Sequence, residues 1–311
     1  MNTWSVFLKK LLTKPIWWWE RNRSYRVRSH YCKLPPISVG RQSSRFVVLT
    51  TPEYFTDALW AAWSWHRFVH EAFELELVVD GEASSNDVVA AQRLFPGVRI
   101  FQAEAIVSAL HQSHPALALF FDHHPLGKKL GVILALQSEK PLFFSDHDVL
   151  AFNPPGEIIS CADCDKPLYM AEGHDGSFDL KIIQRAQELG LEPALGLNSG
   201  LLYVPKGRLS IDLASKLLAD WRPPVSSWFT EQTVLSVLMW VADALPLPYE
   251  RYVVSNRRQF YWEKDVDYAA IAARHFTGTV RHIMYGKGMP KIWRQCKTVS
   301  RRIAGERAFV L

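Results

Sequence analysis

Residues 141–148 read Pro141-Leu142-Phe143-Phe144-Ser145-Asp146-His147-Asp148, and this stretch decides the fold. Its short apolar and aromatic run predicts a central strand that stops abruptly at two carboxylates. Ligands of open α/β sheets bind beyond the carboxyl ends of the strands. We therefore expect the chemistry of this protein to centre on Asp146 and Asp148.

The segments around this strand alternate between strands and helices. Short apolar runs predict strands at 46–50, 75–79, 98–101 and 200–204. Three- and four-residue spacing of apolar side chains predicts helices at 126–138, 209–220 and 231–242. Another helix is predicted after the first strand, with Thr56 as its N-cap. The residues that recur at this spacing there are Leu59, Trp63, His66, Val69 and Phe73. This alternation predicts one α/β domain over residues 46–286, built on an open, mostly parallel twisted sheet flanked by helices.

Composition predicts a globular protein with two basic ends. The chain has 311 residues, is 48% hydrophobic and carries a net charge of +5. Residues 1–45 hold ten Lys and Arg against one acid, and residues 287–311 hold seven against one, so the middle is acidic. We interpret these ends as a basic, Trp-rich N-terminal extension and a basic C-terminal tail. Each base near an anionic membrane contributes about 1 kcal/mol, whereas the acidic middle would repel nucleic acid.

The first twenty residues combine Trp17-Trp18-Trp19 with Lys9, Lys10 and Lys14. This pattern is typical of an amphipathic segment at a membrane interface. Lysines interrupt the apolar run too early for a transmembrane span, and we find no small-residue cleavage site after it that would indicate a secretory signal. An alternative is a tail folded back on the core through its tryptophans. The four cysteines are scattered, and no second ligand pair accompanies Cys161-x-x-Cys164, so we expect free thiols. We expect the protein to be cytoplasmic, with peripheral contact at the inner face of the membrane.

The pair Asp146 and Asp148 suits a hard divalent metal ion. Aspartates at i and i+2 point to the same side if strand geometry persists, and their oxygens are ligands for Mg²⁺ or Mn²⁺. Such an ion can neutralise the charge on a departing nucleotide diphosphate. The alternative is a turn in which Asp146 caps the next segment.

Several motifs, in order, resemble the nucleotide-diphospho-sugar glycosyltransferases of the GT-A fold, particularly glycosyltransferase family eight. The segment 144–150 resembles the strand and DxD element of that family, and 275–281 resembles its later HxxGxxK. Asn198-Ser199-Gly200 resembles its NxG, and Glu231-Gln232 resembles its Asp-Gln pair. The resemblance spans roughly residues 46–285 and implies a Rossmann-like nucleotide-sugar transferase fold.

The resemblance implies roles for the metal and diphosphate residues. Asp146, Asp148 and His275 would bind Mn²⁺ or Mg²⁺, Gly278 would let the backbone approach a phosphate closely, and Arg281 would bind the diphosphate in place of the family's lysine. The Pro-Trp that follows this lysine in the family is replaced here by His282-Ile283.

The same resemblance implies catalytic residues at the sugar. Asn198 would face the donor sugar, Glu231 would hold its hydroxyls, and Gln232 would lie on the far face of the anomeric carbon. Two plainer interpretations remain: Asn198 belongs to a turn before a strand, and Thr230 is a helix N-cap with Glu231 in the first turn.

Four further residues would bind the nucleotide by the same resemblance. Tyr54 would stack on a uracil base, with Thr51 beside it where the family often has an acid. Either Lys128 or Lys129 would reach the donor diphosphate or sugar, and the other would be a solvated helix lysine.

Together these motifs predict a metal-dependent glycosyltransferase. It would move a hexose from a nucleotide-diphosphate sugar, expected to be UDP-linked, to a glycan, lipid-linked or protein acceptor with retention of configuration. The alternative is a non-catalytic protein of the same fold that docks on a membrane or partner through its basic ends.

Overall fold

The computed structural model describes residues 15, 19, 22, 25–161, 164–172, 177–225, 227–255, 265–278 and 280–297. The amphipathic segment predicted within the first twenty residues lies almost entirely outside the described residues. So does the end of the basic C-terminal tail, from residue 298 onward.

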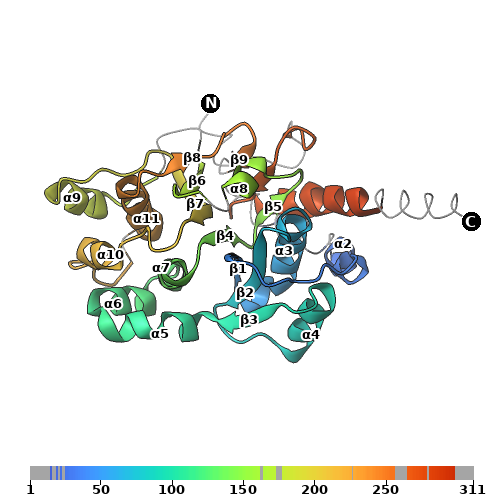
Figure 1. Cartoon of the computed structure of the whole chain (residues 1–311), viewed down its shortest axis with the longest axis horizontal. Helices are drawn as coiled ribbons and strands as arrows, with labels where there is room; N and C mark the ends of the chain where they lie inside the picture. The colour runs from blue at the N-terminus through green and yellow to red at the C-terminus, as the bar shows by residue number, and fades with distance from the viewer. Residues whose placement is uncertain are drawn as a thin grey trace, which may run out of the picture.

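A seven-stranded sheet forms the centre of the protein (Figure 1), with strand order β3-β2-β1-β4-β7-β6-β8. β1 pairs in parallel with β2 and β4, and only β7 runs against its neighbours. The strands are β1 (Ser44–Thr50), β2 (Phe73–Val79), β3 (Arg99–Gln102), β4 (Leu142–Asp146), β6 (Leu168–Ala171), β7 (Leu197–Val204) and β8 (Leu245–Pro246). The predicted open, mostly parallel sheet is confirmed.

Helices cover both faces of this sheet, and each face has its own apolar core. One core packs under α3 (Phe55–Val69), α4 (Ser85–Leu94) and α8 (Gly156–Ser160). The other packs under α5 (Ala103–Ser113), α6 (Pro115–His123), α7 (Gly127–Glu139), α9 (Leu180–Glu188), α10 (Ile211–Leu217) and α11 (Thr230–Val241). Strands buried on both faces explain why the predicted strands read as continuous apolar runs.

The predicted strands and helices occur, but three residues predicted at helix ends have other positions in the structure. The first helix begins at Phe55 after a 3₁₀ turn over Pro52–Tyr54, so Thr56 lies inside the helix and is not its N-cap. Phe73 opens β2, where it pairs with Ser44 and is fully buried, because α3 ends at Val69. Thr230 is the first residue of α11, and its hydroxyl donates to Asp179.

Strand geometry does not persist through the two aspartates, contrary to our expectation. β4 ends at Asp146, residues 147 and 148 form a turn, and β5 (Val149–Ala151) leaves for a second sheet. That sheet has the order β5-β10-β9, with β9 at Tyr252–Val254 and β10 at Ala273–His275. Because His275 pairs with Val149 across β5 and β10, it lies beside Asp148 despite the distance in sequence.

Parts of both flanking segments pack against the central region. Near the N-terminus, α2 (Tyr25–Ser29) is followed by a 3₁₀ turn at His30–Lys33 and then by β1. In the segment after this turn, Leu34 is buried and the Pro35 carbonyl accepts a hydrogen bond from the indole N–H of Trp63. At the other end, α12 (Arg281–Ile283) and the π-helical turn Met284–Gly288 continue as a helix over 289–297 that buries Met289 and Ile292. The division of the chain at residues 45 and 286 stays a prediction. No described helix is long and apolar enough to cross a membrane.

Candidate active site

A pocket of about 850 Å³ opens at the carboxyl ends of β1 and β4. These two strands lie where the chain reverses its order in the sheet, which is the ligand-binding crevice of open α/β folds. Ten of the twelve predicted site residues line the pocket: Thr51, Lys129, Asp146, Asp148, Asn198, Glu231, Gln232, His275, Gly278 and Arg281. Tyr54 and Lys128 do not line it.

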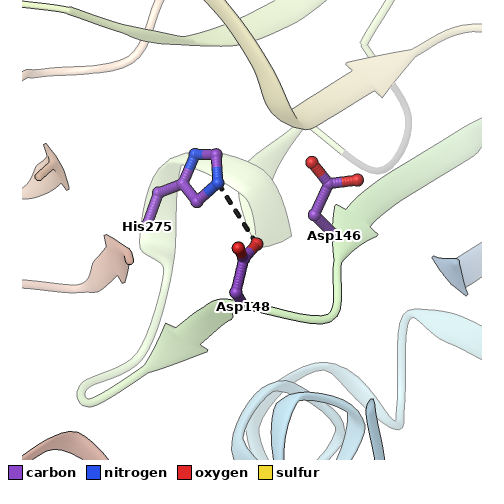
Figure 2. Close-up of side chains that lie close together, drawn as sticks. All are labelled: Asp146, Asp148 and His275. Carbon is purple, nitrogen blue, oxygen red and sulfur yellow. Dashed lines mark ion pairs between the residues drawn. The ribbon is translucent and has the colours of Figure 1, made fainter. Parts of the chain in front are cut away.

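Asp146, Asp148 and His275 all line this pocket, and their side chains lie close together (Figure 2). One ligand atom from each lies within 4.8 Å of the others. His275 Nε2 is 3.2 Å from Asp148 Oδ1. Two carboxylates and an imidazole at this separation are a donor set that can hold a divalent metal ion.

Arg281 lies on the other side of the Asp148 carboxylate. Its guanidinium Nη2 is 2.6 Å from Asp148 Oδ2. Burial alone would raise the pKa of Asp148, but the neighbouring Arg281 guanidinium and His275 imidazole outweigh it and hold the pKa well below its ordinary value. The Asp148 carboxylate therefore stays ionised, as a metal ligand must be.

Tyr54 is engaged by protein side chains at the edge of the site. Its ring stacks on His147 with centroids 4.9 Å apart, and the Arg281 guanidinium carbon lies 4.9 Å from the Tyr54 centroid. Stacking of Tyr54 on a base stays a prediction. In this arrangement Tyr54 supports the turn that carries Asp148 and the arginine that contacts it.

The structure distinguishes the two lysines that the sequence left open. Lys129 is buried in the pocket, where its Nζ lies 2.8 Å from Asp146 Oδ2 and 3.7 Å from Glu231 Oε1. Lys128 points to a separate surface pocket and pairs with Asp80 and Glu104. Burial would lower the pKa of Lys129, but Asp146 and Glu231 outweigh it and raise the pKa, so Lys129 is a fixed positive charge.

Glu231 and Gln232 approach the pocket from the first turn of α11. Ser199 Oγ donates to Glu231 Oε2 at 3.1 Å, while the buried Oε1 of Glu231 has no hydrogen-bond partner among the described residues. Burial raises the pKa of Glu231, with nearby Lys129 opposing. Gln232 donates to the carbonyl of Ser177 at 3.3 Å.

Asn198 and Gly200 lie inside β7, not in a turn before it. Asn198 Oδ1 is 2.7 Å from His275 Nδ1, and the Asn198 amide donates to Glu172 Oε1 at 3.0 Å. A Cβ at Gly278 would meet nothing within 4 Å, so no described atom requires glycine there.

Several lining residues were not predicted. Glu172 follows the short strand β6, which the sequence did not reveal, and Ser199 stood unremarked between Asn198 and Gly200. Trp228 and Phe229 line the pocket while 59% and 41% exposed, respectively. Because they precede Glu231-Gln232 closely in sequence, these two aromatic residues could have been predicted to form an apolar wall of the pocket.

Three solved structures with a similar fold are glycosyltransferases. WbbM, described as a bifunctional glycosyltransferase, overlays on 78% of this chain with a TM-score of 0.51 and 12% identity; the chain spans about half of WbbM, 47%. Mouse xyloside xylosyltransferase 1 overlays on 78% with a TM-score of 0.50 and 11% identity, and 99% of its chain is covered. An active-site mutant of LgtC overlays on 78% of this chain with a TM-score of 0.50 and 14% identity, and 95% of its chain is covered.

The chain has the GT-A fold. This confirms the fold expected from the resemblance, and the pocket lies where the GT-A sheet reverses its strand order. No protein-family model and no curated protein matches the sequence. Identities of 11–14% to the three structures show the GT-A fold alone.

Proposed function

We propose that this protein is a metal-dependent glycosyltransferase that moves a hexose from a UDP-linked sugar to a glycan, lipid-linked or protein acceptor with retention. One observation carries the proposal: Asp146, Asp148 and His275 converge in a single pocket of a GT-A sheet. Asp148 and His275 are 127 residues apart in sequence. Their meeting in the ligand-binding crevice therefore supports a shared role in binding a metal ion.

The residues present fit Mn²⁺ or Mg²⁺. Asp146 and Asp148 offer oxygen atoms, and His275 offers a nitrogen that already faces Asp148. A bound divalent ion would neutralise negative charge on the diphosphate leaving group. Arg281 and Lys129 flank the ligands and add two fixed positive charges for the same diphosphate.

Glu231 and Gln232 would bind the sugar. Oε1 of Glu231 is a buried acceptor that receives no hydrogen bond among the described residues, and a sugar hydroxyl would satisfy it. Gln232 would lie on the far face of the anomeric carbon, so the acceptor would attack from the leaving-group face and a diphosphate oxygen would accept its proton. The exposed rings of Trp228 and Phe229 offer the acceptor an apolar wall at the mouth.

Thermal unfolding with a panel of nucleotide sugars, each with Mn²⁺ and with EDTA, tests the proposal. A ligand that binds the folded state raises the apparent melting temperature, and we expect this rise for UDP-sugars only when Mn²⁺ is present. Slow release of UDP from the same sugar without an acceptor would show catalysis. If no nucleotide raises the melting temperature with either metal, the protein is not this enzyme and the docking alternative is favoured.

We also propose that the basic ends hold this enzyme at the inner face of an anionic membrane. The excess of Lys and Arg in residues 1–45 and 287–311 supports this. Sedimentation of the full chain with vesicles tests it: binding should require anionic lipid and weaken with salt, and equal binding to neutral vesicles would contradict it.

A further inference from the structure

We infer that Asn198, Gly200 and Glu172 position the imidazole of His275, fixing its proton on Nδ1 so that Nε2 is free to bind the metal ion. The inference rests on the proposed function, since it assigns these residues to the metal site of that function. It gives Asn198 a different task from the sugar contact that the family resemblance implies.

β7 brings Asn198 and Gly200 to the same imidazole at the point where its pairing with β6 shifts register. Asn198 Oδ1 lies 2.7 Å from His275 Nδ1. Ser199, which lies between them in sequence, bonds to Lys129 and Glu231. Neighbouring residues of one strand thus contact the metal ligand and the buried charges.

Two independent neighbours fix the orientation of the Asn198 amide. The backbone N–H of Gly200 donates to Asn198 Oδ1 at 3.0 Å. The amide nitrogen of Asn198 donates to Glu172 Oε1, also at 3.0 Å. A flipped amide would place oxygen against a carboxylate and NH₂ against an N–H, so both contacts would be lost. The atom that faces His275 is therefore the oxygen.

This orientation decides the tautomer of His275. An amide oxygen only accepts, so His275 Nδ1 must carry the hydrogen. In the neutral imidazole Nε2 then has the lone pair, and Nε2 is the atom that lies 3.2 Å from Asp148 Oδ1. A histidine ligand held through its other nitrogen in this way is oriented for the metal before the metal arrives.

Gly200 leaves the space in which the ring lies. A Cβ on Gly200 would lie 2.5 Å from both Cε1 and Nδ1 of His275, closer than real contacts allow. The His275 side chain is buried between β7 and the Asp148 turn, so the ring cannot move away freely. Gly200→Ala would therefore tilt the imidazole and shift Nε2.

Asn198 has little capacity left for a sugar. Its oxygen already accepts from Gly200 and His275, and one of its two amide hydrogens is used by Glu172. At most one hydrogen bond remains for a ligand. Its contacts are with the metal ligand and the strand, which is the pattern of a positioning residue.

Titration of the full-length protein with Mn²⁺, followed by electron paramagnetic resonance, tests this inference without an activity assay. We expect Asn198→Leu and Gly200→Ala each to weaken Mn²⁺ binding about 10–100-fold. Gly156→Ala is the matched control, because a Cβ there meets nothing within 4 Å, and its Mn²⁺ affinity should equal that of the wild type. In the double variant Asn198→Asp/Glu172→Gln, one carboxylate oxygen still faces Nδ1 and the new amide at 172 donates to the other oxygen, so the variant should recover most of the affinity.

Nuclear magnetic resonance of ¹⁵N-histidine-labelled protein with diamagnetic Zn²⁺ gives a second readout. In the wild type His275 should carry its proton on Nδ1, and in Asn198→Leu this preference should be lost. The gap in affinity between UDP and a UDP-sugar should stay unchanged in the Asn198→Asp/Glu172→Gln variant, whereas a sugar contact at Asn198 predicts a change. If Asn198→Leu does not fold, Gly200→Ala and the double variant decide.

The outcomes separate the two proposals. If the wild type binds no Mn²⁺, the proposed function fails and this inference fails with it. If the wild type binds Mn²⁺ and both Asn198→Leu and Gly200→Ala bind it equally well, only the positioning role is overturned. Failure of the double variant to recover affinity would equally overturn the hydrogen-bond argument.

Discussion

Lys129 Nζ lies 2.8 Å from Oδ2 of Asp146, so a fixed positive charge from α7 contacts the carboxylate at the end of β4. The same ammonium lies 3.7 Å from Glu231 Oε1. Two acids from different elements therefore share one buried cation. This relationship links the metal group to the residues proposed to bind the sugar.

Lys129→Met should lower both stability and donor binding. It leaves the carboxylates of Asp146 and Glu231 without this cation, and removing one partner of a buried pair costs about 3 kcal/mol. Lys128→Met is the matched control, because Lys128 pairs with partly exposed acids and such pairs contribute about 1 kcal/mol or less. Urea unfolding of both variants measures the difference, and equal losses would contradict the assignment.

Asp148→Ala should abolish metal-dependent donor binding. Asp148 is one of the two carboxylates of the metal group and the partner of Arg281. Calorimetry with a UDP-sugar and Mn²⁺ measures the effect, and we expect no detectable heat of binding. Asp220→Ala, at an exposed position, is the control and should bind as the wild type does. Unchanged affinity in Asp148→Ala would refute the site.

His66 should make the protein less stable in mild acid. Burial of this side chain in α3 lowers its pKa from 6.5 to about 4. The folded state therefore binds fewer protons than the unfolded state between these values, so stability is full near pH 7 and falls as pH drops from about 6.5 to about 4. The total loss from this group is about 3 kcal/mol.

His66→Gln isolates this contribution, because glutamine does not titrate. Urea unfolding at pH 7 and pH 5 should show a smaller loss of stability for the variant than for the wild type, by about 2 kcal/mol. Parallel pH dependence in the two proteins would show that folding does not lower the pKa of His66.

Gly131→Ala should destabilise the protein although alanine favours helices. A Cβ there would lie 2.6 Å from Cγ1 of Val107 and 2.9 Å from Cζ of Phe121, where α7 packs against α5 and α6. Such overpacking costs about 1–3 kcal/mol. Thermal unfolding compared with Gly156→Ala, where the Cβ meets open space, measures it. A variant as stable as this control would show that the helices yield without cost.

Local patterns predicted five strands of the central sheet, β1, β2, β3, β4 and β7, and four of the helices, α3, α7, α10 and α11. Strands buried on both faces appear as apolar runs, so β1, β2, β4 and β7 were found within a few residues. The short strands β5, β6, β8, β9 and β10 have two to four residues and carry too little periodicity to be detected. The start of α3 was missed because a 3₁₀ turn, not a capping side chain, sets it.

The candidate site was predicted in part by position and in part by resemblance. Asp146 and Asp148 follow a strand that the sequence itself reveals, and ten of the twelve named residues line one pocket. Glu172 could not be found, because a single glutamate after an undetected strand has no distinguishing pattern. The choice between Lys128 and Lys129 also needed the structure, since neighbouring helix residues point in different directions.

The sequence by itself determined the alternation of strands and helices, the acidic middle between basic ends, and the two carboxylates at the end of a buried strand. Hydrophobic periodicity and charge are local properties of the chain, so they can be read without the fold. Only the tertiary structure decided which nitrogen of His275 faces Asp148, which lysine enters the pocket, and that Asn198 faces an imidazole. These depend on the register of β5 with β10 and on the face that β7 presents, which are set by packing between segments far apart in the chain.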